Sequence, residues 1–283
     1  MKEISLDISE LRKEYALSCV ENYVMALISQ KYSEWEVIYS ESFLSVSEIL
    51  RRLDDRGFSY FKGVPRLQAM AEDYGFINMQ WVEDASVFDP DNKEYYAFMI
   101  NDEYMKAKYN AQLWRPDHFI LAHNDDDRIE YLNDIPPDHG FLSKEECVEN
   151  YNNGSIVFGF GEYKSDREKL LSTCRDNADK IEKALNEPDQ YQFDNDIEKL
   201  RDAVCVEKVL VKRQGDFLRL MGEEFDSSEY YNYLNGLNAK IEYIRLRKKK
   251  LDTLGDMVKD LIESDKVYYK KIVEVLRRVA KND

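Results

Sequence analysis

The chain has 283 residues, of which 43% are hydrophobic, and it carries a formal net charge of −16. This hydrophobic content is sufficient for a folded core, and the length suits two domains of ordinary size. The negative charge argues against nucleic-acid or anionic-membrane partners, because their phosphates would repel the protein.

The cysteines and the first residues bear on the cellular compartment. Residues 1–7 lack the apolar segment of a signal peptide, and no apolar run approaches membrane-spanning length. None of the four cysteines forms a C-x-x-C pair, so a zinc knuckle or a thioredoxin-like motif is not expected. We therefore expect a cytoplasmic protein with reduced thiols.

Three helices are predicted in the first part of the chain. Residues 19–31 place apolar side chains at three- and four-residue spacing, which favours a helix with one buried face. Residues 47–56 form a second helix, which Gly57 ends, and residues 64–74 form a third, with Pro65 in its first turn.

Residues 76–160 change to a strand pattern. Strands are predicted at residues 77–82, 95–100, 118–122, 128–132 and 154–160, with short helices at 102–108 and after Ser143. The polar residues 124–127 join two of these strands into an antiparallel hairpin, which brings His118 close to Asn133 and Asp134. Pro136 and Pro137 are predicted to end the second strand.

Strand patterns almost disappear after about residue 162. Helices are predicted at residues 167–185, 194–223, 227–251 and 254–280, which together form a helical bundle or lid. The sequence thus predicts an α+β protein with a catalytic domain at residues 1–162, built from an antiparallel sheet and a central helix. An α-helical domain follows at residues 163–283.

Cys19 is the candidate nucleophile. Ser18 and Glu21 have the S-x-x-E spacing of a capping box, so Cys19 is expected at the first position of a helix. Free backbone N–H groups and the helix dipole would lower its pKa and favour the thiolate. The alternative is an ordinary buried thiol.

His118 is the candidate base. A Cys on a helix N-terminus, a His on one strand and an Asn or Asp on the next is the layout of a papain-like site. Either Asp134 or Asn133 would orient His118, but not both, because neighbouring strand residues point to opposite faces; we favour Asp134. His123 is expected at the hairpin turn and His139 in a loop, and neither a metal site nor a cofactor is expected.

The second oxyanion donor cannot be identified from the sequence. Papain-like peptidases usually carry a Gln about six residues before the Cys, and residues 11–18 contain none. Loss of such a donor costs about two to three orders of magnitude in rate. Another group must therefore substitute for it, or the substrate must already be activated.

The Cys-x-Glu-Asn-Tyr helix start, the Glu41-Ser42 region, the His118-Phe-Ile-Leu-Ala strand and the Asn133-Asp134 strand end resemble the N-terminal domain of the butirosin biosynthesis protein H family. The resemblance covers about residues 10–160, in motif order more than in identities. It extends at greater distance to the peptidase domains of bacteriocin exporters and, in function, to the cysteine-protease-like amide synthetases of closthioamide-type pathways. It implies a papain-like fold and transfer of an acyl group from a carrier-protein thioester to an amine through an acyl-cysteine.

Three functions remain open from the sequence. The first is such an acyltransferase in bacterial natural-product (peptide antibiotic) biosynthesis, with an acyl or peptidyl carrier protein and a small-molecule amine as partners. An acidic carrier would need a basic surface, for which residues 245–250 are the best candidate, although a solvated helix face is the simpler interpretation. The others are a cysteine peptidase or amidase and a non-catalytic protein that binds a peptide or natural product; the oligomeric state is open.

Overall fold

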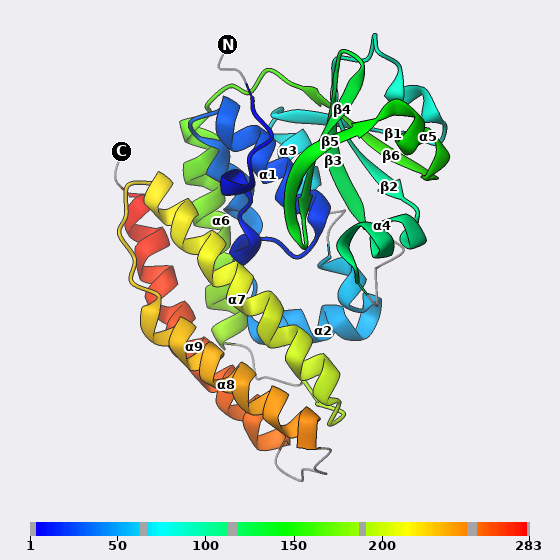
Figure 1. The fold of residues 1–283 in the computed structure, drawn as a ribbon. Helices are drawn as coiled ribbons and strands as arrows, with labels where there is room; N and C mark the ends of the chain where they lie inside the picture. The colour runs from blue at the N-terminus through cyan, green and yellow to red at the C-terminus, as the bar shows by residue number, and fades with distance from the viewer. Residues whose placement is uncertain (1–3, 63–66, 112–117, 187–190, 248–253, 282–283) are drawn as a thin grey trace. The chain divides into compact units, whose positions relative to one another are not determined.

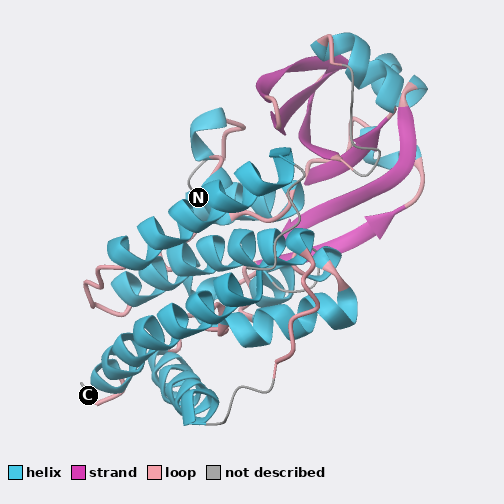
Figure 2. Cartoon of the chain, turned by 90° about the horizontal axis from the view of Figure 1, so that it is seen from below, coloured by secondary structure: helices cyan, strands magenta, loops and turns pink. Residues whose placement is uncertain are grey.

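The computed structural model describes residues 4–62, 67–111, 118–186, 191–247 and 254–281. The chain forms two compact units: Met1–Trp35 with Gly63–Lys164, called here the sheet unit, and Glu36–Lys62 with Ser165–Asp283, called the helical unit. All strands of the described residues belong to the sheet unit. Figure 2 draws these strands in magenta. The predicted α+β class is confirmed.

The sheet has six antiparallel strands within the described residues, in the order β1-β6-β2-β3-β4-β5. Figure 1 shows them clustered in the green and cyan part of the chain. The strands are β1 (Ile77–Val82), β2 (Tyr95–Ile100), β3 (Phe119–Asp125), β4 (Arg128–Asp134), β5 (Pro137–Ser143) and β6 (Tyr151–Phe160). Five of these six follow the sequence prediction closely.

The remaining strand, β5, is absent from the prediction: β4 ends at Asp134, before Pro136 and Pro137, as expected, but a further strand begins at Pro137. The chain turns at Ile135 and Pro136, and Pro137 pairs with Asp134 as the first residue of β5. Because β5 is an edge strand that begins with a proline, the missing N–H is tolerated there. His139 therefore lies in a strand and not in a loop, and its Nε2 lies 2.7 Å from Glu130 Oε1.

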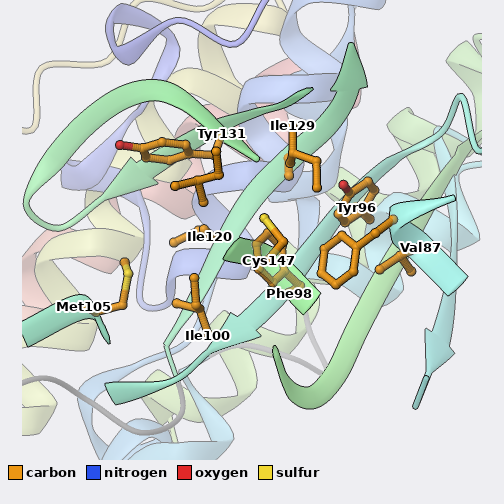
Figure 3. Close-up of a cluster of buried hydrophobic side chains, with 12 residues drawn as sticks. Val87, Tyr96, Phe98, Ile100, Met105, Ile120, Ile129, Tyr131 and Cys147 are labelled. Atoms are coloured by element: carbon orange, nitrogen blue, oxygen red, sulfur yellow. The ribbon is translucent and has the colours of Figure 1, made fainter. Parts of the chain in front are cut away.

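The two faces of the sheet carry different environments. One face holds a cluster of buried apolar side chains from β2, β3 and β4, covered by residues such as Val87, Met105 and Cys147 (Figure 3). Strand alternation turns Leu121, Leu132 and Asp134 to the opposite face, and α1 (Cys19–Lys31) packs there against β3.

The helix α1 is buried over most of its surface. Ten of its thirteen residues are buried, including the polar Glu21, Asn22 and Gln30, so the prediction of a single buried face is wrong. The sheet unit also contains α3 (Leu67–Asp73), α4 (Asp102–Tyr109) and α5 (Lys144–Glu149). Residues 64–66 of the predicted 64–74 helix lie outside the described residues.

The helical unit contains α2 (Val46–Arg56), α6 (Arg167–Asn186), α7 (Ile197–Leu220), α8 (Ser228–Arg247) and α9 (Leu254–Val279). Helix α9 packs against α6, α7 packs against α8, and α2 packs against α7 and α9. Short 3₁₀ turns complete the described elements at Ile8–Glu10, Lys13–Tyr15, Trp35–Glu41, Phe58–Tyr60 and Ala85–Phe88.

The observed division differs from the predicted boundary at residue 162 mainly in residues 36–62. These residues belong to the helical unit because the apolar face of α2, with Val46, Ile49 and Leu50, packs on helices that come more than a hundred residues later. None of the described helices has the length and apolar character needed to cross a membrane.

Candidate functional site

Cys19 is the first residue of α1, as the sequence predicts. The side chain of Ser18 caps the helix by accepting a hydrogen bond from the Glu21 N–H at 3.1 Å. The Glu21 carboxylate accepts from the Leu17 N–H at 2.7 Å, one residue earlier than in a standard capping box. These bonds fix the backbone on both sides of the thiol.

The environment of the thiol raises its pKa, which overturns the expectation of a lowered value. Burial raises the pKa of Cys19 to about 12, and the charge of Asp134 acts in the same direction. The backbone N–H groups of Phe119, Val20 and Cys19 itself lower the pKa by hydrogen bonding to the sulfur, but their effect is smaller. The helix N-terminus is visible in the sequence, whereas the burial that outweighs it is not.

His118 directly precedes β3. The next residue, Phe119, is the first of β3, and its N–H reaches the Cys19 sulfur. The His118 Nε2 atom lies 2.7 Å from Asn133 Oδ1 and 3.6 Å from Asp134 Oδ1. The β3–β4 hairpin produces this proximity. Because Leu121 pairs with Leu132, the start of β3 lies beside the end of β4. The predicted neighbourhood of the three residues is therefore present.

Asn133 determines which nitrogen of His118 carries the proton. Its side chain is fully buried, and its Nδ2 donates to the Pro136 carbonyl at 2.7 Å. The Oδ1 atom therefore faces His118 and can only accept a hydrogen bond, so Nε2 must be the donor. In the neutral ring this leaves Nδ1 as the basic nitrogen.

Asp134 is held mainly by α1. Its Oδ2 accepts from Asn22 Nδ2 at 3.2 Å, and its Oδ1 lies 3.4 Å from the Tyr23 hydroxyl, which also lies 2.8 Å from the Phe119 carbonyl. Burial raises the pKa of Tyr23 well above its usual value, so the hydroxyl stays a donor. Of the two proposed orienting residues, Asn133 makes the closer contact with His118. Asn133 and Asp134 both come near His118, because His118 lies before the first residue of β3 and its side chain is not held to one face of the sheet.

Asn22 and Tyr23 are parts of this site that the sequence reasoning missed. They lie three and four residues after Cys19, the spacing that puts side chains on one face of a helix, and this spacing could have identified them. Asn22 also accepts a hydrogen bond from the Arg12 N–H at 2.8 Å through its Oδ1. It therefore connects the N-terminal segment to the Asp134 carboxylate.

The other candidate groups do not join the site. His123 lies inside β3 and not at the turn; it pairs with Glu130, and its ring packs against Tyr95 at a centroid distance of 4.7 Å. Gln30 does not replace the missing oxyanion glutamine, because its amide bonds Ser5 and Ala26. Among the described residues, no group of three or more His, Cys, Asp or Glu side chains could hold a metal ion.

In comparisons with protein-family models, with curated proteins and with solved structures, no match to this chain was found. Inference about function therefore depends on the chemistry of the site.

Proposed function

We propose that the protein is a papain-like cysteine acyltransferase that moves an acyl or peptidyl group from a carrier-protein thioester to an amine. The observation that supports this proposal best is the orientation of His118 by Asn133 at 2.7 Å, beside the residue whose N–H contacts the Cys19 sulfur. An imidazole held by an amide, directly before the residue whose N–H reaches a thiol, fits the arrangement of a cysteine nucleophile and its base.

In the first half-reaction, the Cys19 sulfur attacks the thioester carbonyl while His118 Nδ1 takes the thiol proton. The raised pKa of Cys19 means that this proton leaves during the attack, and not before it. The tetrahedral intermediate then breaks its bond to the carrier sulfur, which takes the proton from the imidazolium. The products are an acyl-cysteine and the free carrier thiol.

In the second half-reaction, an amine attacks the acyl-cysteine and gives a proton to His118. The carbon–sulfur bond breaks, the amide leaves, and the proton returns to Cys19. A thioester is more reactive than an amide, so a site without a recognised second oxyanion donor suits it better than a peptide bond does. This chemistry favours acyl transfer over proteolysis by the same residues.

The docking surface for a carrier gains no support from the basic cluster at residues 245–250. Arg245 forms ion pairs with Glu198 at 2.6 Å and with Glu242 at 2.6 Å, so its charge is already neutralised. Lys248, Lys249 and Lys250 lie outside the described residues. The carrier remains a partner inferred from the reaction alone.

One observation favours a second candidate, a non-catalytic binding protein: the pKa of about 12 keeps Cys19 protonated at neutral pH. Intact-protein mass spectrometry with acyl-thioester donors separates the two candidates. An acyltransferase gains the mass of the acyl group, and an added amine discharges it. Cys19→Ala should gain no mass, whereas Cys205→Ala, which removes an exposed cysteine, should react like the wild type. The absence of an adduct with every thioester tested would contradict the proposal.

A further inference from the structure

Trp81 in β1 is a large apolar side chain that the fold leaves half exposed. Its relative exposure is 49%, although the facing positions of the neighbouring strands β6 and β2, Ile156 and Ala97, are buried. Its ring meets Phe119 edge to face at a centroid distance of 6.2 Å. An exposed tryptophan that packs against a residue of the candidate site is a feature that the proposed reaction does not yet use.

The strand register places Trp81, Met99 and Phe119 on one face of the sheet. Met99 pairs with Phe119, and the row that starts at Trp81 continues across β6 and β2 to β3. Alternation along each strand then puts all three side chains opposite the buried cluster of Figure 3. This is the face on which α1 and Asp134 lie.

Gly154 in β6 makes the space that Trp81 occupies. A Cβ atom at this position would lie 2.4 Å from Met99 Cε and 2.6 Å from Trp81 Cη2. The thioether and the indole therefore converge directly over the glycine backbone, and a larger residue there would have to displace them. The result is an apolar surface made of Trp81, Met99 and Phe119, which we call the Trp81 platform.

The Trp81 platform is connected to the thiol through a single residue. The Phe119 N–H donates to the Cys19 sulfur, while the Phe119 ring packs against Trp81. A group bonded to the sulfur thus starts beside Phe119 and has an apolar surface next to it. Polar substituents would gain little there, because the three side chains offer only the indole N–H as a strong hydrogen-bond donor.

We propose that the Trp81 platform is the acyl-binding subsite of the enzyme and selects apolar acyl groups, either aliphatic or aromatic. This inference depends on the proposed function, since the acyl group is the one that Cys19 carries. Each methylene that leaves water for the platform should raise the acylation rate constant about fourfold, until the surface is covered. Trp81 is then a specificity-determining residue.

The test measures acylation of Cys19 by N-acetylcysteamine thioesters with acetyl, butyryl, hexanoyl, octanoyl and phenylacetyl groups, using intact-protein mass spectrometry. The wild-type rate constant should rise with chain length, and Trp81→Ala should reduce the octanoyl-to-acetyl ratio about tenfold. Gly154→Ala, which displaces the indole, should reduce the same ratio. Phe141→Ala removes an aromatic side chain of similar exposure, 47%, which pairs with Glu130 in the sheet, and should keep the wild-type ratio.

A wild-type rate that does not depend on chain length overturns the proposal, as does a Trp81→Ala protein that keeps the wild-type ratio. Alkylation of Cys19 by iodoacetamide and by N-benzyl iodoacetamide, located by peptide mapping, separates this failure from failure of the proposed function. A Trp81-dependent preference for the benzyl reagent, without acylation by any thioester, supports an apolar subsite and rejects the acyltransferase. Acylation without any such preference supports the acyltransferase and rejects the subsite.

Discussion

The sheet unit and the helical unit each bury acidic side chains, but Asp134 of the first and Glu207 of the second are surrounded in opposite ways. In the sheet unit, Asp134 receives a hydrogen bond from Asn22 and lies close to the Tyr23 hydroxyl. In the helical unit, Glu207 is fully buried, and neither of its carboxyl oxygens has a hydrogen-bond partner among the described residues. Tyr230 lies near Glu207 and Asp265, and its hydroxyl donates to Asp265 at 3.2 Å.

The difference shows how hydrogen-bond donors affect the pKa of a buried carboxyl group. Burial, together with the negative charge of Asp265, raises the pKa of Glu207 well above its usual range, so burial favours the protonated form of Glu207. Asp265 instead accepts hydrogen bonds from the Val46 N–H at 3.0 Å and from Tyr230. Donors directed at a carboxylate let a buried charge persist, and without them a buried acid holds its proton.

The largest expected effect comes from removing His118, the proposed general base of the sheet unit. His118→Ala should lower the rate of Cys19 acylation by about 10²–10⁴-fold, because no group remains to take the thiol proton. His123→Ala is the matched control and should keep the wild-type rate, since His123 packs on Tyr95. Equal losses in the two variants, measured with one thioester, would show that the effect is structural.

The pH dependence of the thiol tests the strength of burial at the same site. Alkylation of Cys19 by iodoacetamide should rise about tenfold per pH unit from about pH 6 to about pH 9, because the thiolate fraction grows by this factor below the pKa. With a pKa of about 12, no plateau is expected in this range. Cys19→Ala gives the background from the other cysteines, and a plateau near neutral pH would instead indicate a thiolate–imidazolium pair.

Removing the amide that holds the imidazole should have a smaller effect. Asn133→Ala should lower the acylation rate by about 10–100-fold, because His118 Nε2 loses its acceptor in a buried position and the ring loses its orientation. Asn133→Asp restores an acceptor, so it should recover part of the rate. A pH–rate profile distinguishes a changed base from a misfolded site, and an unchanged rate in Asn133→Ala would remove Asn133 from the mechanism.

The last prediction concerns the stability of the helical unit and not the rate of acylation. Glu207 has a folded pKa above its unfolded value, so its contribution to stability is complete below about pH 4.5 and falls as the pH rises towards the folded pKa. The slope is at most about 1.4 kcal/mol per pH unit. Glu207→Gln keeps the shape without the charge and should flatten the fall in thermal midpoint as the pH rises above about 4.5. Identical slopes in the variant and the wild type would mean that Glu207 finds a partner in solution.

At the site, the features that depend on residues close together in the sequence could be predicted. The polar turn between β3 and β4 is contiguous in sequence with the two strands that it joins. The neighbourhood of His118, Asn133 and Asp134 could therefore be predicted. The cap on α1 could be predicted for the same reason, since Ser18 and Glu21 are only three residues apart. The four long helices after residue 165 also follow directly from their apolar periodicity.

Features that depend on long-range packing could not be predicted. The pKa of Cys19 depends on how much of the fold covers α1, and the sequence around Ser18 contains no information about that. The position of Pro137 at the start of an edge strand depends on strand order, and the placement of residues 36–62 depends on α7 and α9. In each case the deciding partner lies far away in the chain.

The membership of residues 36–62 in the helical unit has a consequence for folding during synthesis. The helix α2 ends at residue 56, and its packing partner α7 begins at residue 197, about 140 residues later. At about 5–20 residues per second, translation of the intervening chain takes roughly 7–28 s. During that time Val46, Ile49, Leu50 and Leu53, which are buried in the folded protein, lack their native partners. The chain of the sheet unit, which runs to Lys164, is therefore complete before the helix that packs on the inserted residues 36–62 has been made.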